Sequence, residues 1–223
     1  MPTRVFLVRH GATVLSAEDR FAGATDVELS DEGRRQARSL AERLAETPIA
    51  AIYSSHMRRA VETATLVGTP SGLVPTSHTG LREIDHGRWE GLTRREVEAG
   101  FPEEYAAWEE DPFTFAPEGG ESGLAVMARS LPVVRELVLR HAGQSFVVVS
   151  HKATIRLLLC SLLGIDARGY RDRLDQAPAC LNILDFKDVV RVRLTLYNDT
   201  SHYRAEARHP EALLSKWWDQ DAK

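Results

Sequence analysis

Two histidines stand where apolar runs of the sequence end. His10 follows Arg9 and the run Val5–Val8, and His151 lies one residue beyond the run Phe146–Val149. Continuous apolar runs of this length are typical of strands that are covered on both faces. Ligands of open α/β sheets bind at the carboxyl ends of such strands, so we expect the two imidazoles to face each other. One histidine alone is more often structural, whereas two at equivalent strand ends indicate a reactive site.

A pair of arginines follows another expected strand, Ala50–Tyr53. Arg58 and Arg59 fall near the first turn of a helix expected at about Met57–Val67, where the helix dipole disfavours a cation. A bound anion would favour an arginine there, because a guanidinium fork matches phosphate oxygens and the helix-end N–H groups add to the binding. Arg58 is interpreted as a solvent-exposed residue.

Carboxylates are concentrated in the segment Leu81–Gly91, which contains Glu83, Asp85 and Glu90. One of them could donate a proton to a leaving alkoxide, and a carboxyl group beside a phosphate dianion has its pKa raised, as a general acid requires. Each of the three taken alone is more often a surface charge, and their spacing does not choose among them.

These residue types suit phosphoryl transfer to a histidine nitrogen. Neutral imidazole is a competent nucleophile, and neighbouring arginines oppose its protonation and stabilise the charge on the transferring oxygens. The second histidine, as an imidazolium, could bind those oxygens, and a carboxylic acid would protonate the departing oxygen before water releases the phosphate. We therefore expect no metal and no cofactor. The sequence has no GxxxxGK[ST], GxGxxG, HExxH or GxSxG motif, so nucleotide-loop, zinc and serine-esterase chemistries find no support.

The composition is that of an ordinary globular protein. Its 223 residues are 43% hydrophobic and 27% charged, which suits a single domain, residues 1–223, with a sizeable core. The net charge of −4 argues against a nucleic-acid partner, which needs a basic face. No apolar run approaches the roughly 18 residues of a membrane span, and the run before Arg9 is too short for a signal peptide. We expect no membrane partner, a cytoplasmic location, a monomer or homodimer, and buried, reduced thiols at Cys160 and Cys180.

Strands alternate with helices along most of the chain. Ser30 and Ser122 are placed to cap two of the helices. The order of buried strands and helices predicts an α/β fold, a three-layer α/β/α sandwich with a mostly parallel central sheet. The later elements are expected as a helix from Ser122 to about His141, an apolar helix Ala153–Leu163, and two strands, Cys180–Phe186 and Val189–Tyr197, joined by a turn at Lys187-Asp188.

The stretch from about Leu81 to Glu121 interrupts this alternation. It is rich in Glu, Trp and Pro, and residues 91–121 are expected to form a helical insertion that lies over the sheet as a lid. The adjacent Trp217 and Trp218 suggest an edge helix packed on the body or, less readily, a dimer contact. Aromatic residues of the middle stretch could line the pocket or, as is more common at this spacing, form a small core of the insertion; they are Trp89, Tyr105, Trp108 and Phe113.

Taken together, these segments resemble the histidine phosphatase superfamily, which includes the cofactor-dependent phosphoglycerate mutases. Five or six motifs of that family match in order across almost the whole chain, whereas Arg-His-Gly alone would be a weak signal. The opening motif has two segments, Leu7–Thr13 and Arg20–Ser30 with Gly33 and Gln36-Ala37. The other matches are Ser54-Ser55 with Arg59-Ala60 and Glu62–Ala64, Leu81–Glu83 with Gly87–Gly91, Glu118–Ser122, Val149–His151 and Asn198–His202.

The resemblance implies a role for each residue of the expected site. His10 would be phosphorylated and Glu83 would act as the acid and base. Arg9, Arg59 and His151 would bind the phosphate. The match thus selects Arg59 over the preceding arginine and Glu83 over the other two carboxylates.

Three further positions are expected to contact the phosphate or the rest of the substrate. Gly23 falls in the second matching segment. Ser16 stands where the family often has an asparagine that contacts phosphate, which predicts a weaker or water-mediated contact. Lys152 follows His151 where glycine is usual, and its ammonium could add charge to the phosphate pocket or bind a second acidic group of the substrate.

The acid motif Gly87–Leu92 is similar to the phosphatase branch of the family, and we find no counterpart of the longer arginine- and proline-rich insert of the mutases. We therefore expect a histidine acid phosphatase-type phosphomonoesterase that hydrolyses a small phosphorylated metabolite, such as a sugar phosphate or phosphoglycerate, through a phosphohistidine. A phosphoglycerate mutase is the alternative within the family. A non-catalytic phosphate-binding regulatory protein is the alternative outside enzymes, and it is disfavoured because all five reactive positions carry competent residues.

Overall fold

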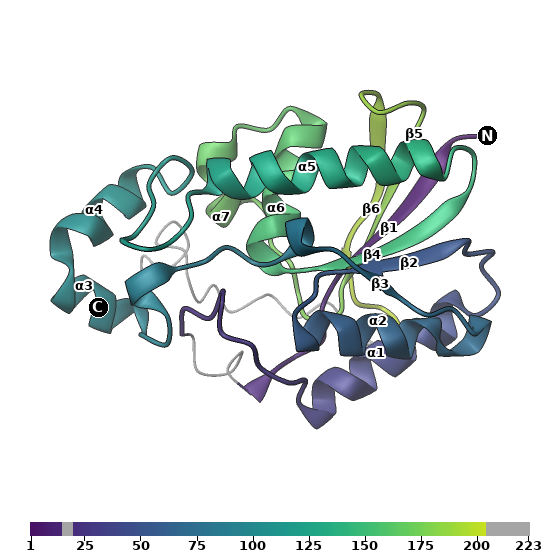
Figure 1. Cartoon of the computed structure of the whole chain (residues 1–223), viewed down its shortest axis with the longest axis horizontal. Helices are drawn as coiled ribbons and strands as arrows, with labels where there is room; N and C mark the ends of the chain where they lie inside the picture. The colour runs from purple at the N-terminus through teal and green to yellow at the C-terminus, as the bar shows by residue number, and fades with distance from the viewer. Residues whose placement is uncertain (15–19, 204–223) are drawn as a thin grey trace.

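A computed structural model describes residues 1–14 and 20–203 of the chain. Within these residues six strands form one sheet in the order β3-β2-β4-β1-β5-β6 (Figure 1). The first four strands in that order run parallel, whereas β5 and β6 run antiparallel to their neighbours. The strands are β1 (Thr3–Arg9), β2 (Ala51–Ser54), β3 (Thr76–Ser77), β4 (Ser145–Ser150), β5 (Leu181–Phe186) and β6 (Val192–Asp199).

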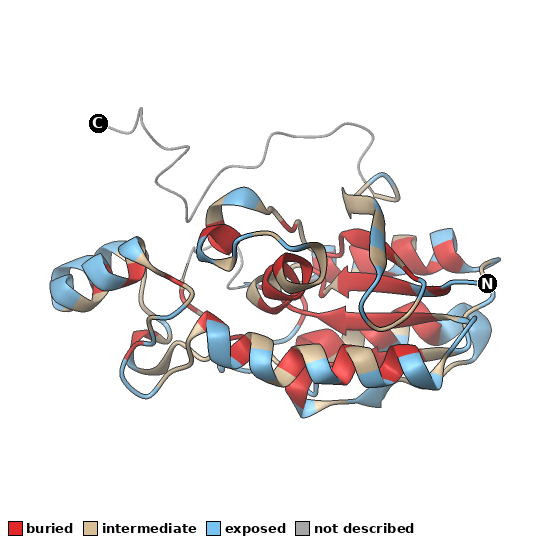
Figure 2. Cartoon of the chain, turned by 90° about the horizontal axis from the view of Figure 1, so that it is seen from above, coloured by how far each residue is buried: buried red, intermediate tan, exposed pale blue. Residues whose placement is uncertain are grey.

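Helices cover both faces of the sheet, which confirms the predicted three-layer α/β/α sandwich with a mostly parallel sheet (Figure 1). Side chains of β1 alternate between the faces. Phe6 and Val8 pack against one pair of helices, while Val5 and Leu7 pack against the other. Figure 2 shows that the central strands are buried along most of their length. The first pair is α1 (Asp31–Leu44) and α2 (Arg58–Gly68), and the second pair is α5 (Gly123–Arg140) and α6 (Lys152–Leu163).

The strand register brings the two histidine segments together at one edge of the sheet. Arg9 of β1 pairs with Ser150 of β4, and the N–H of His10 donates to the carbonyl of Ser150 at 3.0 Å. Because β5 runs antiparallel to β1, its first residue, Leu181, lies beside Val8 at the same edge. The carboxyl ends of the parallel strands and the start of β5 therefore surround one region.

Most predicted boundaries agree with the structure to within one or two residues. Ser30 accepts from the N–H of Gly33 at 3.1 Å, and Ser122 accepts from that of Ala125 at 3.2 Å, so both predicted caps are confirmed. The turn predicted at Lys187-Asp188 is longer than expected. The Asp188 carboxylate accepts from the N–H groups of residues 190 and 191, which holds these residues in the turn and delays β6 to Val192.

Residues 91–121 contain two short helices, α3 (Arg94–Gly100) and α4 (Pro102–Glu110). They lie beyond the end of the sheet and not over either of its faces (Figure 1), and their role as a lid stays a prediction. Three of the four aromatic residues in question, Trp89, Tyr105 and Trp108, pack with Phe21 and Val97 into a separate apolar cluster. Phe113 packs instead against a second cluster beside α5 and α6. The remaining helices are the short α7 (Tyr170–Arg173) and the 3-10 turns η2 (Thr69–Ser71), η3 (Thr79–Leu81), η4 (Gly87–Trp89) and η5 (Ala167–Gly169).

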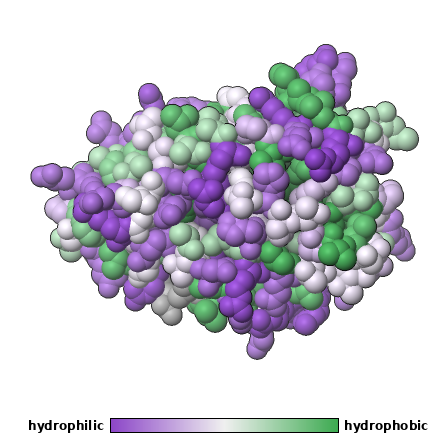
Figure 3. Space-filling model, in the orientation of Figure 1, coloured by the Kyte–Doolittle hydropathy of each residue, from purple (hydrophilic) through white to green (hydrophobic). Residues whose placement is uncertain are grey.

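Cys160 and Cys180 are buried free thiols, as predicted. No helix among residues 1–14 and 20–203 has the length and apolarity to cross a membrane. Polar and apolar side chains are intermixed on the face seen in Figure 3. The predictions for Ser16 and for the pair Trp217-Trp218 lie outside the described residues.

Candidate active site

His10 and His151 lie side by side at the carboxyl ends of β1 and β4. The centroids of their rings are 5.1 Å apart, and the side chains are buried, with 6% and 0% of each residue exposed. The expectation from the two apolar runs therefore agrees with the structure: the two strand ends bring both imidazoles into one site.

The ring of His10 is held with one nitrogen available for reaction. Its Nδ1 lies 2.8 Å from the carbonyl oxygen of Gly11. Because a carbonyl only accepts, Nδ1 carries the proton and Nε2 keeps its lone pair. Burial, together with the nearby charges of Arg59 and Arg9, holds the pKa of His10 well below its usual range. The side chain is a neutral imidazole whose Nε2 can act as a nucleophile.

The ring of His151 has the opposite arrangement of its proton. The Nε–H of Arg59 donates to Nδ1 of His151 at 3.3 Å, so Nε2 carries the hydrogen. That Nε2–H is buried and has no hydrogen-bond partner among the described residues. Burial and then Arg59 hold the pKa of His151 well below its usual range. The lowered pKa and the Arg59 contact favour a neutral His151 that donates from Nε2, whereas the imidazolium expected to bind the transferring oxygens stays a prediction.

Arg59 also fixes the loop that follows the first strand. It lies in the first turn of α2, is 2% exposed, and donates to the carbonyls of Gly23 and Thr25 at 3.0 and 2.8 Å. Gly23 passes very close to the chain, since a Cβ placed there would lie 1.6 Å from the carbonyl oxygen of Ile84. A glycine is required at this position by the contact, and the loop is thereby locked beside the two histidines.

Arg9 is positioned by residues that the sequence analysis did not identify. Its Nη1 donates to the carbonyl of Gln176 at 2.6 Å, and the side chain of Gln176 exchanges two hydrogen bonds with that of Asn182, at 3.1 and 2.8 Å. Both amide residues are buried. The Nε of Arg9 is buried without a hydrogen-bond partner among the described residues. Buried amides before and within a strand are the signal that could have indicated this network.

Of the three candidate carboxylates, Glu83 contacts the start of the helix that follows His151. Its carboxylate accepts from the N–H groups of Ala153 and Thr154, each at 3.2 Å, at the start of α6. That helix begins directly after His151. Glu83 is 9% exposed.

Glu90 holds a loop. Its carboxylate accepts from the N–H groups of Gly23 and Ala24 at 2.9 Å, from Thr25, and from the N–H of His86 at 3.1 Å. The predicted phosphate contact of Gly23 does not use a free amide, because that N–H is bonded to Glu90. Asp85 accepts from the N–H of Gly87 at 2.8 Å and so shapes the following turn.

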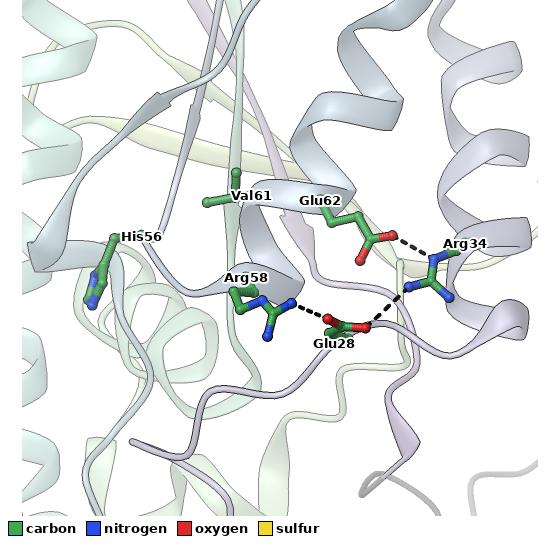
Figure 4. Close-up of a pocket in the computed structure, with 6 residues that line it drawn as sticks. All are labelled: Glu28, Arg34, His56, Arg58, Val61 and Glu62. Atoms are coloured by element: carbon green, nitrogen blue, oxygen red, sulfur yellow. Dashed lines mark hydrogen bonds and ion pairs between the residues drawn. The ribbon is translucent and has the colours of Figure 1, made fainter.

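Arg58 borders a surface pocket whose lining includes neither His10 nor His151. The pocket is bordered by charged residues that form a chain of ion pairs from Arg58 through Glu28 and Arg34 to Glu62 (Figure 4). The Arg58 side chain is 62% exposed, in agreement with its interpretation as a surface residue.

Lys152 is the first residue of α6 and directly follows His151. Among residues 1–14 and 20–203, no cluster of three or more His, Cys, Asp or Glu residues could hold a metal ion. The groups that meet at this edge of the sheet are two imidazoles, the buried guanidinium of Arg59, the partly buried guanidinium of Arg9 and the carboxyl group of Glu83.

Comparison with known proteins agrees with this arrangement. The sequence profile of the histidine phosphatase superfamily (branch 1) matches residues 5–200. Glucosyl-3-phosphoglycerate phosphatase of Mycolicibacterium vanbaalenii is 41% identical over 169 residues, which cover 73% of this chain and 75% of that protein. Phosphoserine phosphatase 1 of Hydrogenobacter thermophilus is 36% identical over 163 residues, which cover 73% of this chain and 77% of that protein.

A solved structure of a phosphatase is also similar to this chain. The native mycobacterial glucosyl-3-phosphoglycerate phosphatase superposes with a TM-score of 0.79 at 36% identity, covering 87% of this chain and 98% of the other. With a profile match that spans nearly every described element and named phosphatases among its relatives, this chain belongs to the histidine phosphatase superfamily.

Proposed function

We propose that the chain is a phosphomonoesterase that hydrolyses a small phosphorylated metabolite through a phosphohistidine at His10. One observation carries the proposal. Two buried donors, Nε of Arg9 and Nε2 of His151, have no partner among the described residues and belong to the residues around the nucleophile. Unpartnered buried donors are costly, and the oxygens of a phosphate group would satisfy both.

The reaction takes two steps. Nε2 of His10 attacks phosphorus, the P–N bond forms as the P–O bond of the ester breaks, and the protonated carboxyl of Glu83 gives its proton to the departing oxygen. Water, deprotonated by the Glu83 carboxylate, then attacks phosphorus, and the P–N bond breaks to release inorganic phosphate and return the electron pair to His10. Arg9, Arg59 and the Nε2–H of His151 bind the transferring oxygens. This is chemistry of the histidine acid phosphatase type.

Trapping the intermediate tests this proposal. Enzyme mixed with a phosphate-labelled ester is quenched within milliseconds into alkali, in which phosphohistidine is stable, and the label is mapped by mass spectrometry. We expect label on His10, no label in His10→Ala, and a loss of activity in that variant of at least about 10³-fold. A loss below about tenfold without any phosphohistidine would leave the protein a non-catalytic phosphate binder.

The same assay separates hydrolysis from the mutase alternative. With 3-phosphoglycerate as substrate and a bisphosphoglycerate primer, a phosphatase releases inorganic phosphate, whereas a mutase yields 2-phosphoglycerate. The names of the two relatives favour hydrolysis. We propose sugar phosphates, phosphoglycerates and related phosphorylated acids as the panel for activity measurements.

Lys152 supports a narrower proposal, that the preferred esters in that panel carry a carboxylate. The two relatives are named for glucosyl-3-phosphoglycerate and phosphoserine, and each of these esters carries a carboxylate. Lys152, directly after His151, would bind such a carboxylate. Lys152→Ala should then raise KM about tenfold for carboxylated esters and leave neutral esters such as phenyl phosphate nearly unchanged. An equal loss on both types would instead assign its charge to the phosphate pocket.

A cytoplasmic location and a monomeric or homodimeric state stay predictions.

A further inference from the structure

Side chains donate hydrogen bonds to the carbonyl groups of four consecutive residues, 80 to 83, the last of which is Glu83. The guanidinium of Arg129, from α5, donates to the carbonyls of Gly80, Arg82 and Glu83, each at 2.9 Å. The carbonyls of residues 81 and 82 also accept from the hydroxyls of Ser150 and Thr154, at 2.8 and 2.7 Å. Residues 82–86 belong to no helix or strand, so side-chain donors take the place of a backbone ladder in fixing this segment.

Arg129 is itself held by a carboxylate. Glu121 accepts from its Nε at 3.0 Å and from its Nη2 at 2.9 Å, and the two side chains are only 15% and 16% exposed. Glu121 also accepts from the side chain of Arg82 at 2.5 Å and from the N–H of Asp85 at 3.2 Å. The N–H of Glu121 in turn donates to the carbonyl of Asp85 at 2.8 Å. The pair thus clamps the main chain on both sides of Glu83.

We propose that Arg129, held by Glu121, is a positioning residue that places the carboxyl of Glu83 for protonation of the leaving oxygen. The inference rests on the proposed phosphatase function. A general acid must come within about 3 Å of the oxygen it protonates, and a displacement of about 1 Å can cost ~10²-fold in rate. The contacts of the Glu83 carboxylate with Ala153 and Thr154 fix one end of the residue, and Arg129 fixes its main chain.

The positioning role of Arg129 depends on the planar geometry of its guanidinium group, and not only on its charge. Three carbonyls and a carboxylate are reached by a planar group with five N–H donors, which a lysine ammonium cannot reproduce. The charge of Arg129 also contributes to the lowered pKa of His151, although less than burial and the charges of Arg59 and Arg9. Arg129→Lys keeps a positive charge and removes the fork, so this variant separates the two effects.

The test compares two leaving groups. An alkyl phosphate needs a proton on its departing oxygen, whereas 2,4-dinitrophenolate departs without one. We expect Arg129→Lys and Glu121→Gln each to lower kcat about 10- to 100-fold on the alkyl ester. On the dinitrophenyl ester kcat should fall less than about threefold, and KM should change little on either substrate. Glu83→Gln should show the same leaving-group dependence with a larger loss.

The double variant Glu83→Gln with Arg129→Lys gives the decisive comparison. If Arg129 acts through Glu83, the double variant loses no more activity on the alkyl ester than Glu83→Gln alone. Losses that multiply, or equal losses on both esters, would overturn the inference. Arg4→Gln serves as the matched control, because it removes a bidentate pair with Asp185, at 2.7 and 2.8 Å, near the opposite end of β1.

Folding and the proposed function are checked separately. Thermal unfolding of every variant is measured alongside, and Glu121→Gln carries the test if Arg129→Lys does not fold. A wild-type protein that hydrolyses neither ester would contradict the proposed function. A wild-type protein that hydrolyses both, with variants that do not distinguish them, would contradict only the role of Arg129.

Discussion

The Nε–H of Arg59 donates to Nδ1 of His151 at 3.3 Å, and this contact decides which nitrogen of the imidazole carries the proton. Arginine has no lone pair to offer, so Nδ1 accepts and Nε2 holds the hydrogen. His10 has its proton on Nδ1, opposite the carbonyl of Gly11. The two rings, 5.1 Å apart, therefore offer a lone pair from one and an N–H from the other, which suit attack on phosphorus and binding of its oxygens.

Nitrogen-15 spectra of the imidazoles check this assignment. At pH 6 we expect both rings to be neutral, with His10 protonated at Nδ1 and His151 at Nε2, because burial and the two arginines oppose a positive charge on either ring. Arg59→Gln should free Nδ1 of His151 and change its tautomer signal. Assignment uses the spectra of His10→Asn and His151→Asn, and an imidazolium signal from either ring at pH 6 would contradict the prediction.

The same shifts predict a loss of stability in mild acid. The folded-state pKa of each histidine lies below the unfolded value of about 6.5, so below that pH the unfolded chain binds more protons than the folded protein. The free energy of unfolding is then fully present above about pH 6.5 and decreases as pH falls towards the lowered values, by up to about 1.4 kcal/mol per pH unit for each histidine. Urea unfolding between pH 7.5 and 5 measures this slope. In His10→Asn the slope should be smaller, and an unchanged slope would exclude His10 as a contributor.

The adjacent residues Arg59 and Arg58 allow a matched comparison, because only Arg59 is assigned to the site. Arg59→Ala should lower kcat/KM by at least about 10²-fold, because it removes a charge beside the phosphate site and releases the loop at Gly23. Arg58→Ala should change kcat/KM by less than about threefold, since its side chain is 62% exposed and pairs with Glu28. Steady-state kinetics with one phosphomonoester measures both variants. Similar losses of kcat/KM in the two would contradict the assignment of Arg59 to the site.

Gly23 tests the packing of the loop that Arg59 holds. Gly23→Ala places a Cβ 1.6 Å from the carbonyl oxygen of Ile84, so the backbone must shift, and we expect a loss of about 2 kcal/mol or more in unfolding free energy. Gly100→Ala is the control, because a Cβ there meets nothing within 4 Å, and its effect should stay below about 1 kcal/mol. Urea unfolding of the two variants gives the comparison. If Gly23→Ala matched the control, the close approach would not exist in solution.

The sequence predicts the position of the two histidines because their place depends on regular structure. Buried strands appear as apolar runs, and parallel neighbours end at one edge, so His10 and His151 had to lie near each other once β1 and β4 pair. The three-layer fold followed from the same pattern. The start of β6 was less well predicted, because the Asp188 turn depends on side-chain hydrogen bonds.

The supporting residues could not be predicted in the same way. Arg129 and Glu121 resemble solvated charges of a helix and its preceding loop, and their partners lie 46 to 49 and 36 to 39 residues away along the chain. Spacing also does not distinguish Glu83 from Glu90, whose different roles follow from which N–H groups surround each carboxylate. The neutral state of His151 depends on burial and on the direction of one N–H, and neither property is encoded in a local pattern.

The direction of β5 ties the site to the order in which the chain is synthesised. The carbonyl of Gln176 holds Arg9, and the N–H of Ala179 donates to the carbonyl of His10 at 3.0 Å. A ribosome-bound chain that has emerged only as far as residue 175 would already contain both histidines, Arg59 and Glu83, but it would lack the segment that holds Arg9 and His10. Hydrolytic competence should therefore arise only after residues 176–179 have emerged and β5 has joined the sheet.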